Sequence, residues 1–111
     1  MADCIFCKIV AGEIPSKKVF EDETLLAFED INPQAPVHIL IVPKKHLVDL
    51  FDGSEEPGLL GEIAARSAAI AKERGLAAYR FLTNTGREAG QAVFHLHFHL
   101  LAGRRMGWPP G

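Results

Sequence analysis

The chain has 111 residues, of which 48% are hydrophobic and 23% are charged, and its formal net charge at pH 7 is −2. These values are typical of one globular domain and exclude a disordered chain, and the 12 lysines and arginines form no basic stripe of the kind that binds nucleic acid. No run approaches the ~20 apolar residues of a membrane span and no signal peptide is apparent. We therefore expect a cytoplasmic protein whose two cysteines are reduced thiols or metal ligands.

The N-terminal segment predicts a short helix. Asp3 can cap a helix over residues 4–11, and Gly12 is a typical residue at which such a helix ends. Cys4 and Cys7 occupy positions i and i+3, so both thiols would lie on one face of this helix.

Three strands are expected next. Residues 19–21 and 24–29 have the pattern of a hairpin. The run 37–42 is strongly β-prone and apolar on both faces except at His38, and Pro43 ends it. We interpret this run as a central strand of a sheet.

One long helix follows these strands. Ser54 or Glu55 can cap it, Pro57 suits its first turn, and Gly75 is expected to end it. Apolar residues at helical spacing between residues 59 and 71 form a stripe that would pack in the core or against a second subunit.

The C-terminal third contains two further strands. Residues 79–84 form the fourth strand, residues 85–91 a glycine-containing loop, residues 92–102 the fifth strand and residues 103–111 an irregular tail. The whole pattern predicts an α+β architecture with an antiparallel five-stranded sheet, one long helix and a short N-terminal helix.

The fifth predicted strand carries three histidines, His95, His97 and His99. They alternate with apolar residues, which is the period of a strand that has one face in a core. All three imidazoles would share the other face, about 6.5–7 Å apart along the strand. Such a row can supply a nucleophile, a group that orients it and a proton donor. A half-buried strand whose polar face happens to be histidine is the alternative.

Several stretches of the chain resemble the histidine triad (HIT) family. The segment from His95 to Leu101 is similar to the family signature, in which three histidines alternate with apolar residues. Further similar segments are Ile5-Phe6-Cys7-Lys8-Ile9-Val10, Glu13-Ile14-Pro15, Phe20-Glu21-Asp22, Pro33-Gln34-Ala35-Pro36-Val37-His38, Pro43-Lys44-Lys45-His46 and Trp108-Pro109-Pro110-Gly111. The combination is most similar to histidine triad nucleotide-binding proteins that act as purine nucleoside phosphoramidases.

The resemblance implies a HIT-like fold over residues 1–111 as one domain. It also implies that the sheet extends across a homodimer, with the tail 103–111 at the dimer interface and at the rim of the active site. The implied activity is hydrolysis of purine nucleoside 5′-phosphoramidates to nucleoside monophosphates through a covalent nucleotidyl-histidine. A dinucleoside polyphosphate hydrolase or nucleotidyltransferase of the same family and a non-catalytic nucleotide- or zinc-binding module are the alternatives.

The resemblance also implies the catalytic roles. His97 is the nucleophile, and His99 lies beside the leaving group and the phosphate, where it can relay a proton. His95 orients His97, and His38 on the neighbouring strand completes the histidine network. A neutral imidazole is a good nucleophile toward phosphorus near pH 7. The sequence contains no phosphate-binding motif of the magnesium-dependent type, so no cofactor is expected to be required for catalysis.

The nucleotide is expected to contact a larger set of residues. Gly90 permits backbone N–H groups of the segment Gly90-Gln91-Ala92-Val93 to converge on phosphate oxygens. By resemblance, Asp30 accepts hydrogen bonds from the ribose, Asn84 contacts ribose or phosphate, and five apolar residues hold the purine: Phe6, Ile9, Ile14, Phe28 and Ile31. Close relatives usually carry serine where this chain has Ala92, so one hydroxyl contact is absent.

Cys4 and Cys7 form a second candidate site. In some relatives such a pair closes a zinc site with two histidines, which residue matching identifies as His46 and His95. Closely related phosphoramidases lack the cysteines, so a zinc ion here would not be needed for the chemistry. Buried reduced cysteines without a metal are the alternative.

Overall fold

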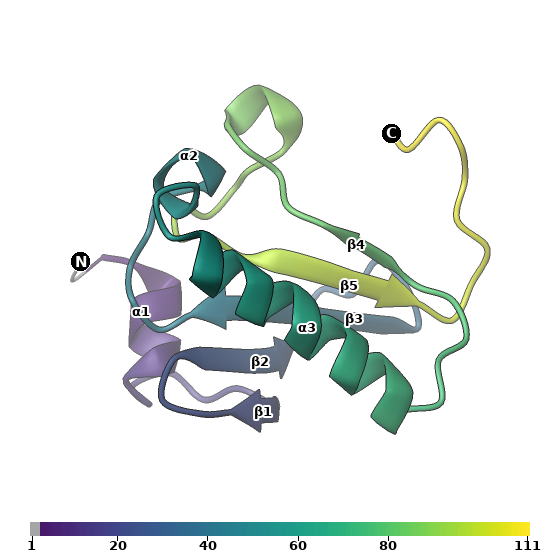
Figure 1. Cartoon of the computed structure of the whole chain (residues 1–111), viewed down its shortest axis with the longest axis horizontal. Helices are drawn as coiled ribbons and strands as arrows, with labels where there is room; N and C mark the ends of the chain where they lie inside the picture. Colours follow the sequence, from purple (N-terminus) through teal and green to yellow (C-terminus); the bar gives the residue numbers. More distant parts are fainter. Residues whose placement is uncertain (1–2) are drawn as a thin grey trace.

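The described residues, 3–111 of a computed structural model, are organised around one antiparallel sheet of five strands (Figure 1). The strands are β1 (Lys18–Glu21), β2 (Leu25–Glu29), β3 (Val37–Pro43), β4 (Arg80–Leu82) and β5 (Phe98–Ala102), in the spatial order β1-β2-β3-β5-β4. The helices are α1 (Ile5–Val10), α2 (Leu50–Gly53) and α3 (Pro57–Glu73), and a single 3₁₀ turn, η1, covers Arg87–Ala89. The predicted α+β fold is confirmed.

None of the helices within residues 3–111 is both long enough and apolar enough to cross a membrane.

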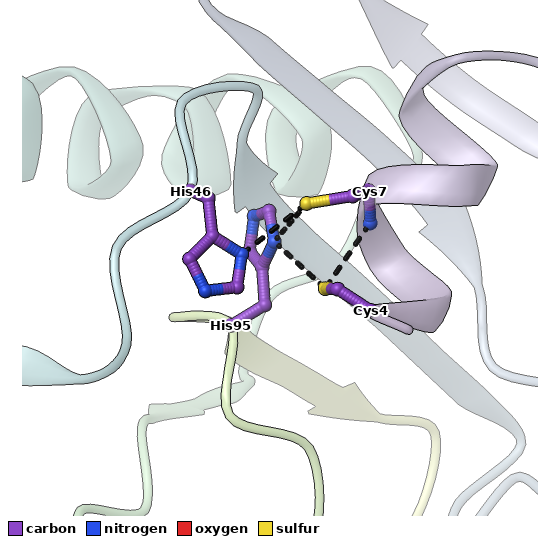
Figure 2. Close-up of side chains that lie close together, drawn as sticks. All are labelled: Cys4, Cys7, His46 and His95. Carbon is purple, nitrogen blue, oxygen red and sulfur yellow. Dashed lines mark hydrogen bonds between the residues drawn. The ribbon is translucent and has the colours of Figure 1, made fainter. Parts of the chain in front are cut away.

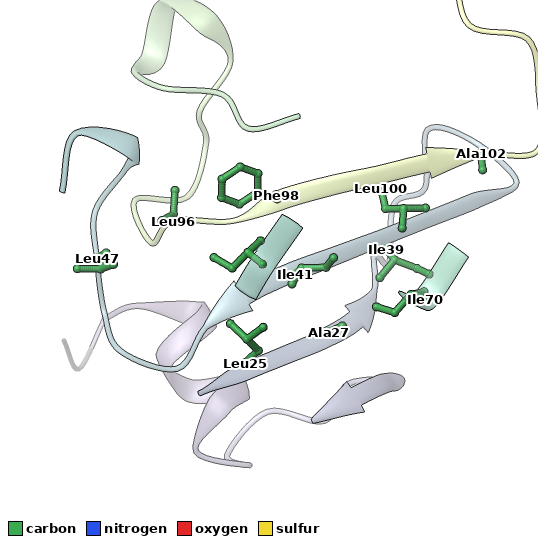
Figure 3. Close-up of a cluster of buried hydrophobic side chains, with 11 residues drawn as sticks. Leu25, Ala27, Ile39, Ile41, Leu47, Ile70, Leu96, Phe98, Leu100 and Ala102 are labelled. Carbon is green, nitrogen blue, oxygen red and sulfur yellow. The ribbon is translucent and has the colours of Figure 1, made fainter. Parts of the chain in front are cut away.

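α3 crosses one face of the sheet and buries its apolar stripe there (Figures 1 and 3). Ile63 and Ile70 are the centre of that stripe, with exposed fractions of 0% and 2%. They pack against side chains of the sheet and its flanking loops: Leu25, Ala27, Ile39, Ile41, Leu47, Leu96, Phe98, Leu100 and Ala102. Burying one large aliphatic side chain contributes about 1.5–3 kcal/mol, so this layer is the main core of the protein. The sequence allowed the stripe to pack either in the core or against a second subunit, and the structure shows it packed in the core.

The start of α3 differs from the sequence-based expectation. Its N-cap residue is Glu56, whose side chain makes no capping hydrogen bond, so the predicted caps Ser54 and Glu55 are wrong. Ser54 instead follows α2, and its hydroxyl donates to the Phe51 carbonyl. Sequence analysis missed α2 because four residues are too few for a periodic pattern. Pro57 is in the first turn of α3 as predicted, where its missing N–H costs nothing.

α1 lies on the opposite face of the sheet (Figure 1). Its N-cap is Cys4, whose sulfur accepts a hydrogen bond from the Cys7 N–H at 3.3 Å, so the predicted cap Asp3 is wrong. Sulfur is a weak acceptor, and packing must therefore hold the helix. Phe6 and Ile9 provide this packing against a second cluster on the sheet, formed by Leu26, Phe28, Leu40 and Val42.

The fifth strand is shorter than predicted. The alternation of histidines and apolar residues predicts a strand over residues 92–102, whereas β5 begins at Phe98. His99 is therefore on the strand, and His95 and His97 lie in the irregular segment before it. The prediction of three histidines on one strand is wrong for two of them.

The cause is the end of the neighbouring strand. In the ladder, Phe98 pairs with Ile41, and continuing this register would bring Leu96 opposite Pro43, which has no N–H to offer. The Leu96 N–H instead donates to the carbonyl of Leu47 at 2.6 Å. Leu96 nevertheless enters the core with an exposed fraction of 1%, so the alternation still predicted the correct side for it.

Candidate active site

His38 and His99 come from neighbouring strands and contact each other. The register of β3 and β5 pairs His38 with Leu101 and Leu40 with His99, which makes the two histidines diagonal neighbours on one face. His38 Nε2 lies 2.9 Å from His99 Nδ1. The Gln34 N–H donates to His38 Nδ1 at 3.0 Å, so a neutral His38 must carry its proton on Nε2 and donate it to His99. The proton of a neutral His99 is then on Nε2.

The Nε2 atom of His99 is the end of this chain of hydrogen bonds. It is buried, and it has no hydrogen-bond partner within residues 3–111. A buried donor without a partner costs about 1–3 kcal/mol, and an atom of this kind calls for an explanation. A ligand that offers an acceptor at this position would remove the cost.

His97 lies directly before β5 and is 8% exposed. Its Nδ1–H donates to the backbone carbonyl of His95 at 2.8 Å, which leaves the lone pair on Nε2. The contact from His95 to His97 thus comes from the carbonyl and not from the His95 imidazole. The Thr83 hydroxyl donates to the His97 carbonyl at 2.7 Å, and the rings of His97 and His99 lie 5.1 Å apart. A lone pair and an unpartnered N–H are therefore adjacent.

Burial keeps these imidazoles uncharged. It lowers the pKa of His38, His97 and His99 below the ordinary 6.5. At His99, burial acts together with the neighbouring His97 and His38 and lowers the pKa to about 4. At His97, the hydrogen bond to the His95 carbonyl and the charge of Asp30 oppose burial without reversing the direction of the pKa shift. All three rings are neutral at pH 7, and the His97 lone pair is free to attack an electrophile.

A cavity of about 310 Å³ opens beside the two rings, which is within the size range of small-molecule sites. Nearly all the residues that the HIT resemblance assigns to the nucleotide line it: Phe6, Ile9, Ile14, Phe28, Asp30, Ile31, Asn84, Gly90, Ala92, Val93, His97 and His99. No lysine or arginine of the described chain is among the lining residues. The sequence-based prediction therefore grouped residues that the structure brings together from α1, two strands and three connecting segments.

Gln91 is the one predicted nucleotide contact that does not line the cavity. Its side-chain amide donates to the carbonyls of Val48 at 2.8 Å and Val93 at 3.2 Å, and its oxygen accepts from the Gly86 N–H at 2.9 Å. With an exposed fraction of 4%, the Gln91 side chain fixes the loop before β5 from within.

Backbone hydrogen bonds within this loop limit which of its N–H groups could donate to a phosphate. Gly90 has a φ of +102°, a left-handed conformation that other residues rarely adopt. The N–H groups of Gly90 and Gln91 donate to carbonyls of the same loop at 2.9 and 3.0 Å. Of the four predicted donors, only Ala92 and Val93 have N–H groups for which no hydrogen bond is seen in residues 3–111.

Asp30 and Ile31 follow β2 and line the cavity. Asp30 Oδ1 accepts from the Asn32 N–H at 2.8 Å and so caps the turn after β2, while Oδ2 lies 3.5 Å from His38 Nε2. Asp30 therefore both caps a turn and faces the histidine network. The Ile31 side chain is 99% exposed, so it becomes buried only if a bound ligand covers it.

A second group of side chains lies next to the histidines: Cys4 and Cys7 of α1, His46 from the loop after β3, and His95 (Figure 2). Cys7 Sγ lies 3.2 Å from His46 Nδ1 and 3.5 Å from His95 Nδ1, and Cys4 Sγ lies 3.4 Å from His95 Nδ1. In a tetrahedral site with ordinary Zn–S and Zn–N bonds, such sulfur and nitrogen atoms are about 3.5 Å apart. The four donor atoms have the spacing of a Cys₂His₂ metal site.

The protonation of His95 also suits a metal ligand. Its Nε2–H donates to the Pro43 carbonyl at 2.8 Å, which leaves the lone pair on Nδ1, the atom that faces both sulfurs. A histidine whose second nitrogen is held by a carbonyl is typical of metal sites in proteins. The residues present therefore fit a zinc ion, which prefers sulfur and nitrogen ligands.

The sequence matches the HIT domain over residues 11–106. The chain belongs to the HIT family. The chain has a fold like that of HIT family hydrolases and of a histidine triad nucleotide-binding protein.

Three similar proteins show the extent of this relationship. A 14 kDa zinc-binding protein of Brassica juncea is 46% identical over 113 aligned residues, which cover 98% of this chain and 100% of the relative. The crystal structure of a HIT family hydrolase from Legionella pneumophila Philadelphia 1 matches with a TM-score of 0.94 and 49% identity, covering 98% and 100% of the two chains. A histidine triad nucleotide-binding protein from Candida albicans matches with a TM-score of 0.85 and 38% identity, covering 96% and 83%.

Sequence reasoning missed several groups that position the histidines of this HIT domain. They are the Gln34 N–H, the Pro43 carbonyl and the Thr83 hydroxyl. Two of them act through the backbone, which leaves no trace in residue type. Thr83 follows β4 and its hydroxyl could have served any neighbour, so nothing in its local sequence marks it as a contact of His97.

Proposed function

We propose that this HIT protein hydrolyses purine nucleoside 5′-phosphoramidates to nucleoside monophosphates, with His97 as the nucleophile. The observation that carries the proposal is the pair formed in one cavity by the His97 Nε2 lone pair and the unpartnered His99 Nε2–H. The first can attack phosphorus, and the second can donate to a phosphoryl oxygen that gains charge.

The cavity offers separate places for the parts of such a substrate. The purine lies among Phe6, Ile9 and Phe28, and the Asp30 carboxylate accepts hydrogen bonds from the ribose hydroxyls. The phosphoryl group then lies beside His97 and His99, where the N–H groups of Ala92 and Val93 provide further donors. Binding thus holds the phosphorus in line with the attacking nitrogen, which supplies much of the rate gain of a displacement.

The reaction follows in two displacements. His97 Nε2 forms a bond to phosphorus while the P–N bond breaks, and the amine departs with the electron pair of that bond. A neutral His99 that accepts at Nδ1 from His38 could give up its single proton only by becoming an anion. The leaving nitrogen therefore takes its extra proton from solvent, and not through His99 as the family resemblance implied. The nucleotidyl-His97 carries a positive ring whose Nδ1–H is held by the His95 carbonyl. Water then forms the new P–O bond, the ring recovers its pair, and the water proton leaves with the product.

The charge of the cavity favours an amine over a polyphosphate as the leaving group. A departing polyphosphate carries several negative charges, which cations stabilise. No lysine or arginine within residues 3–111 lines the cavity. A departing amine needs no such cation.

A comparison of leaving groups tests the proposal. Adenosine 5′-phosphoramidate and adenylated lysine are expected to be hydrolysed at least about a hundredfold faster, in kcat/KM, than diadenosine polyphosphates. The His97→Ala protein should bind AMP but turn over neither class, since it loses the attacking nitrogen. Preference for the polyphosphate would favour the alternative hydrolase, and no turnover of either class would favour a nucleotide-binding module.

We further propose that the Cys4, Cys7, His46 and His95 group binds zinc in a structural role. The similar Brassica juncea protein is named as zinc-binding, and the spacing of the four donor atoms supports the same for this chain. Elemental analysis of protein purified without chelator is expected to give about one zinc per chain. Freely titratable thiols and no zinc would return both cysteines to a packing role.

A further inference from the structure

α1 belongs to both sites. Cys4 at its N-cap and Cys7 supply two sulfurs to the metal-binding group, while Phe6 and Ile9 line the cavity. The helix has six residues, too few to be stable in isolation. Its position therefore depends on the apolar contacts of its cavity-facing side chains and on whatever holds its two thiols.

His95 joins the two sites a second time. Its Nδ1 faces both sulfurs, and its carbonyl accepts the Nδ1 proton of His97. The side chain is 0% exposed, and its other nitrogen is fixed by the Pro43 carbonyl. Because the ring and the carbonyl belong to one residue, what fixes the ring of His95 also fixes the acceptor that orients the nucleophile.

The Phe6 side chain of α1 contacts both His95 and His97. Its ring meets that of His97 edge-on, with centroids 5.0 Å apart and an interplanar angle of 85°. It also packs edge-on against His95 at 6.0 Å and against Phe28 at 5.7 Å. Because Cys7 is the next residue of the same helix turn, a displacement of the Cys7 sulfur displaces the Phe6 ring against the nucleophile and the purine side of the cavity.

We propose that metal binding by Cys4, Cys7, His46 and His95 raises the affinity of the cavity for a nucleoside monophosphate, and that Phe6 is the positioning residue that couples the two sites. This inference rests on the proposed nucleotide site. The metal fixes α1 and the His95 segment in the arrangement that the nucleotide needs and takes no part in the displacement. By linkage, a bound nucleotide must raise the affinity for the metal by the same factor.

Two binding measurements on the full chain test the coupling, and neither uses turnover. Calorimetric titration with AMP compares the zinc-loaded and the chelator-stripped protein, and a chromophoric chelator reports zinc affinity with and without saturating AMP. We expect zinc to tighten AMP binding by about fivefold or more, and AMP to tighten zinc binding by an equal factor. A factor well above one in both titrations is the readout that a merely structural zinc would not produce, because zinc without coupling would leave both factors at one.

A pair of variants on α1 assigns the coupling to Phe6. Phe6→Leu retains all four metal ligands and an apolar side chain, so it should bind zinc in the absence of AMP with near wild-type affinity, while the coupling factor falls toward one. Lys8→Ala is the matched control on the same helix, because Lys8 neither belongs to the metal group nor lines the cavity, and its coupling should equal that of the wild type.

The outcomes separate the two proposals. Equal AMP affinity with and without zinc would overturn the coupling and leave the proposed function in place. Absence of AMP binding in both states would overturn the proposed function and the coupling with it. Absence of zinc binding, or loss of the circular dichroism of the fold on stripping, would overturn the coupling, because the metal would then be missing or would act on the whole fold.

Discussion

The reactive end of His97 is decided by atoms outside its side chain. The His95 carbonyl takes the Nδ1 proton and burial keeps the ring uncharged, so Nε2 carries a lone pair at pH 7. His99 is set in the opposite sense, because His38 donates to its Nδ1 and leaves the N–H on Nε2. Two identical side chains thus have different roles in the proposed reaction. His97 is the nucleophile that attacks phosphorus, and His99 is the hydrogen-bond donor to a phosphoryl oxygen.

Ala92 lines the cavity, and the family resemblance implies a serine hydroxyl at this position. Ala92→Ser is expected to raise kcat/KM for phosphoramidates about two- to tenfold, the value of one additional hydrogen bond of about 0.5–1.5 kcal/mol. Steady-state rates with adenosine 5′-phosphoramidate provide the measurement. An unchanged or lower rate would show that the leaving group does not pass beside residue 92.

Helices and strands hold these residues in place, and the local sequence pattern predicts part of their arrangement. The apolar alternation before and within β5 predicts the buried side of Leu96, Phe98 and Leu100 correctly. The start of β5 could not be predicted in this way, because it depends on Pro43 and on the Leu47 carbonyl, both far away in sequence. Pairing is a non-local property, whereas the side of a strand on which a residue lies is local.

The two candidate sites show the same limit. Gly90 and its neighbours suggested a phosphate loop by residue type, but only the structure shows that the Gly90 and Gln91 N–H groups are already engaged. The convergence of Cys7 with His46 came from resemblance, since two cysteines alone do not indicate which histidines lie near them. The edge contact of Phe6 with His97 joins helix to loop, and no local pattern predicts it.

The loop before β5 provides a prediction for an element. Gly90→Ala places a side chain at a φ of +102° and should lower the free energy of unfolding by about 1–2 kcal/mol. Because the strain acts beside the Ala92 and Val93 N–H groups, kcat/KM should fall as well. Urea denaturation and steady-state rates measure the two effects.

Gly61→Ala is the matched control for that substitution. Gly61 lies in α3, and a Cβ atom there would meet nothing within 4 Å. It should leave activity unchanged and stabilise the protein by about 0.5–1 kcal/mol, since alanine is the better helix former. A Gly90→Ala protein as stable and as active as the wild type would contradict the role given to the loop.

On the scale of the whole molecule, buried histidines make the stability depend on pH. The pKa of His99 is about 4 in the folded protein and near 6.5 when unfolded, so the unfolded chain binds more protons between these values. The contribution of His99 to the free energy of unfolding should therefore fall as pH decreases from 6.5 to 4 and level off below. The pKa of Glu21 is lowered to about 2 by hydrogen bonds from Lys18 and Lys44, so Glu21 contributes to the pH dependence of stability only below pH 4.5.

Thermal melting from pH 7 to pH 4, with chelator present so that metal release does not contribute, checks this dependence. The melting temperature of the wild type should decrease over this range, and that of His99→Gln should decrease less, because the variant lacks one of the groups that must take up a proton. An identical slope in both proteins would contradict the assignment to His99.

The sheet also bears on assembly. β4 is an edge strand of the described sheet, so one row of its backbone N–H and C=O groups can pair with a second copy of the chain. Trp108 in the tail is 84% exposed. We expect a homodimer at micromolar concentration, with the two sheets joined into one, and a weaker dimer for Trp108→Ala. Sedimentation equilibrium measures both. A monomeric wild type would refute the dimer and leave the exposed tryptophan without a role.

The central claim is that His97 becomes covalently linked to the nucleotide. Intact-protein mass spectrometry after rapid, acid-free quenching of a reaction with adenosine 5′-phosphoramidate tests it most directly, with peptide mapping to locate the modified residue. We predict an adenylyl adduct on the wild type, mapped to His97 and absent from His97→Ala. Turnover by the wild type with no adduct at any quench time, together with normal turnover by His97→Ala, would contradict the account.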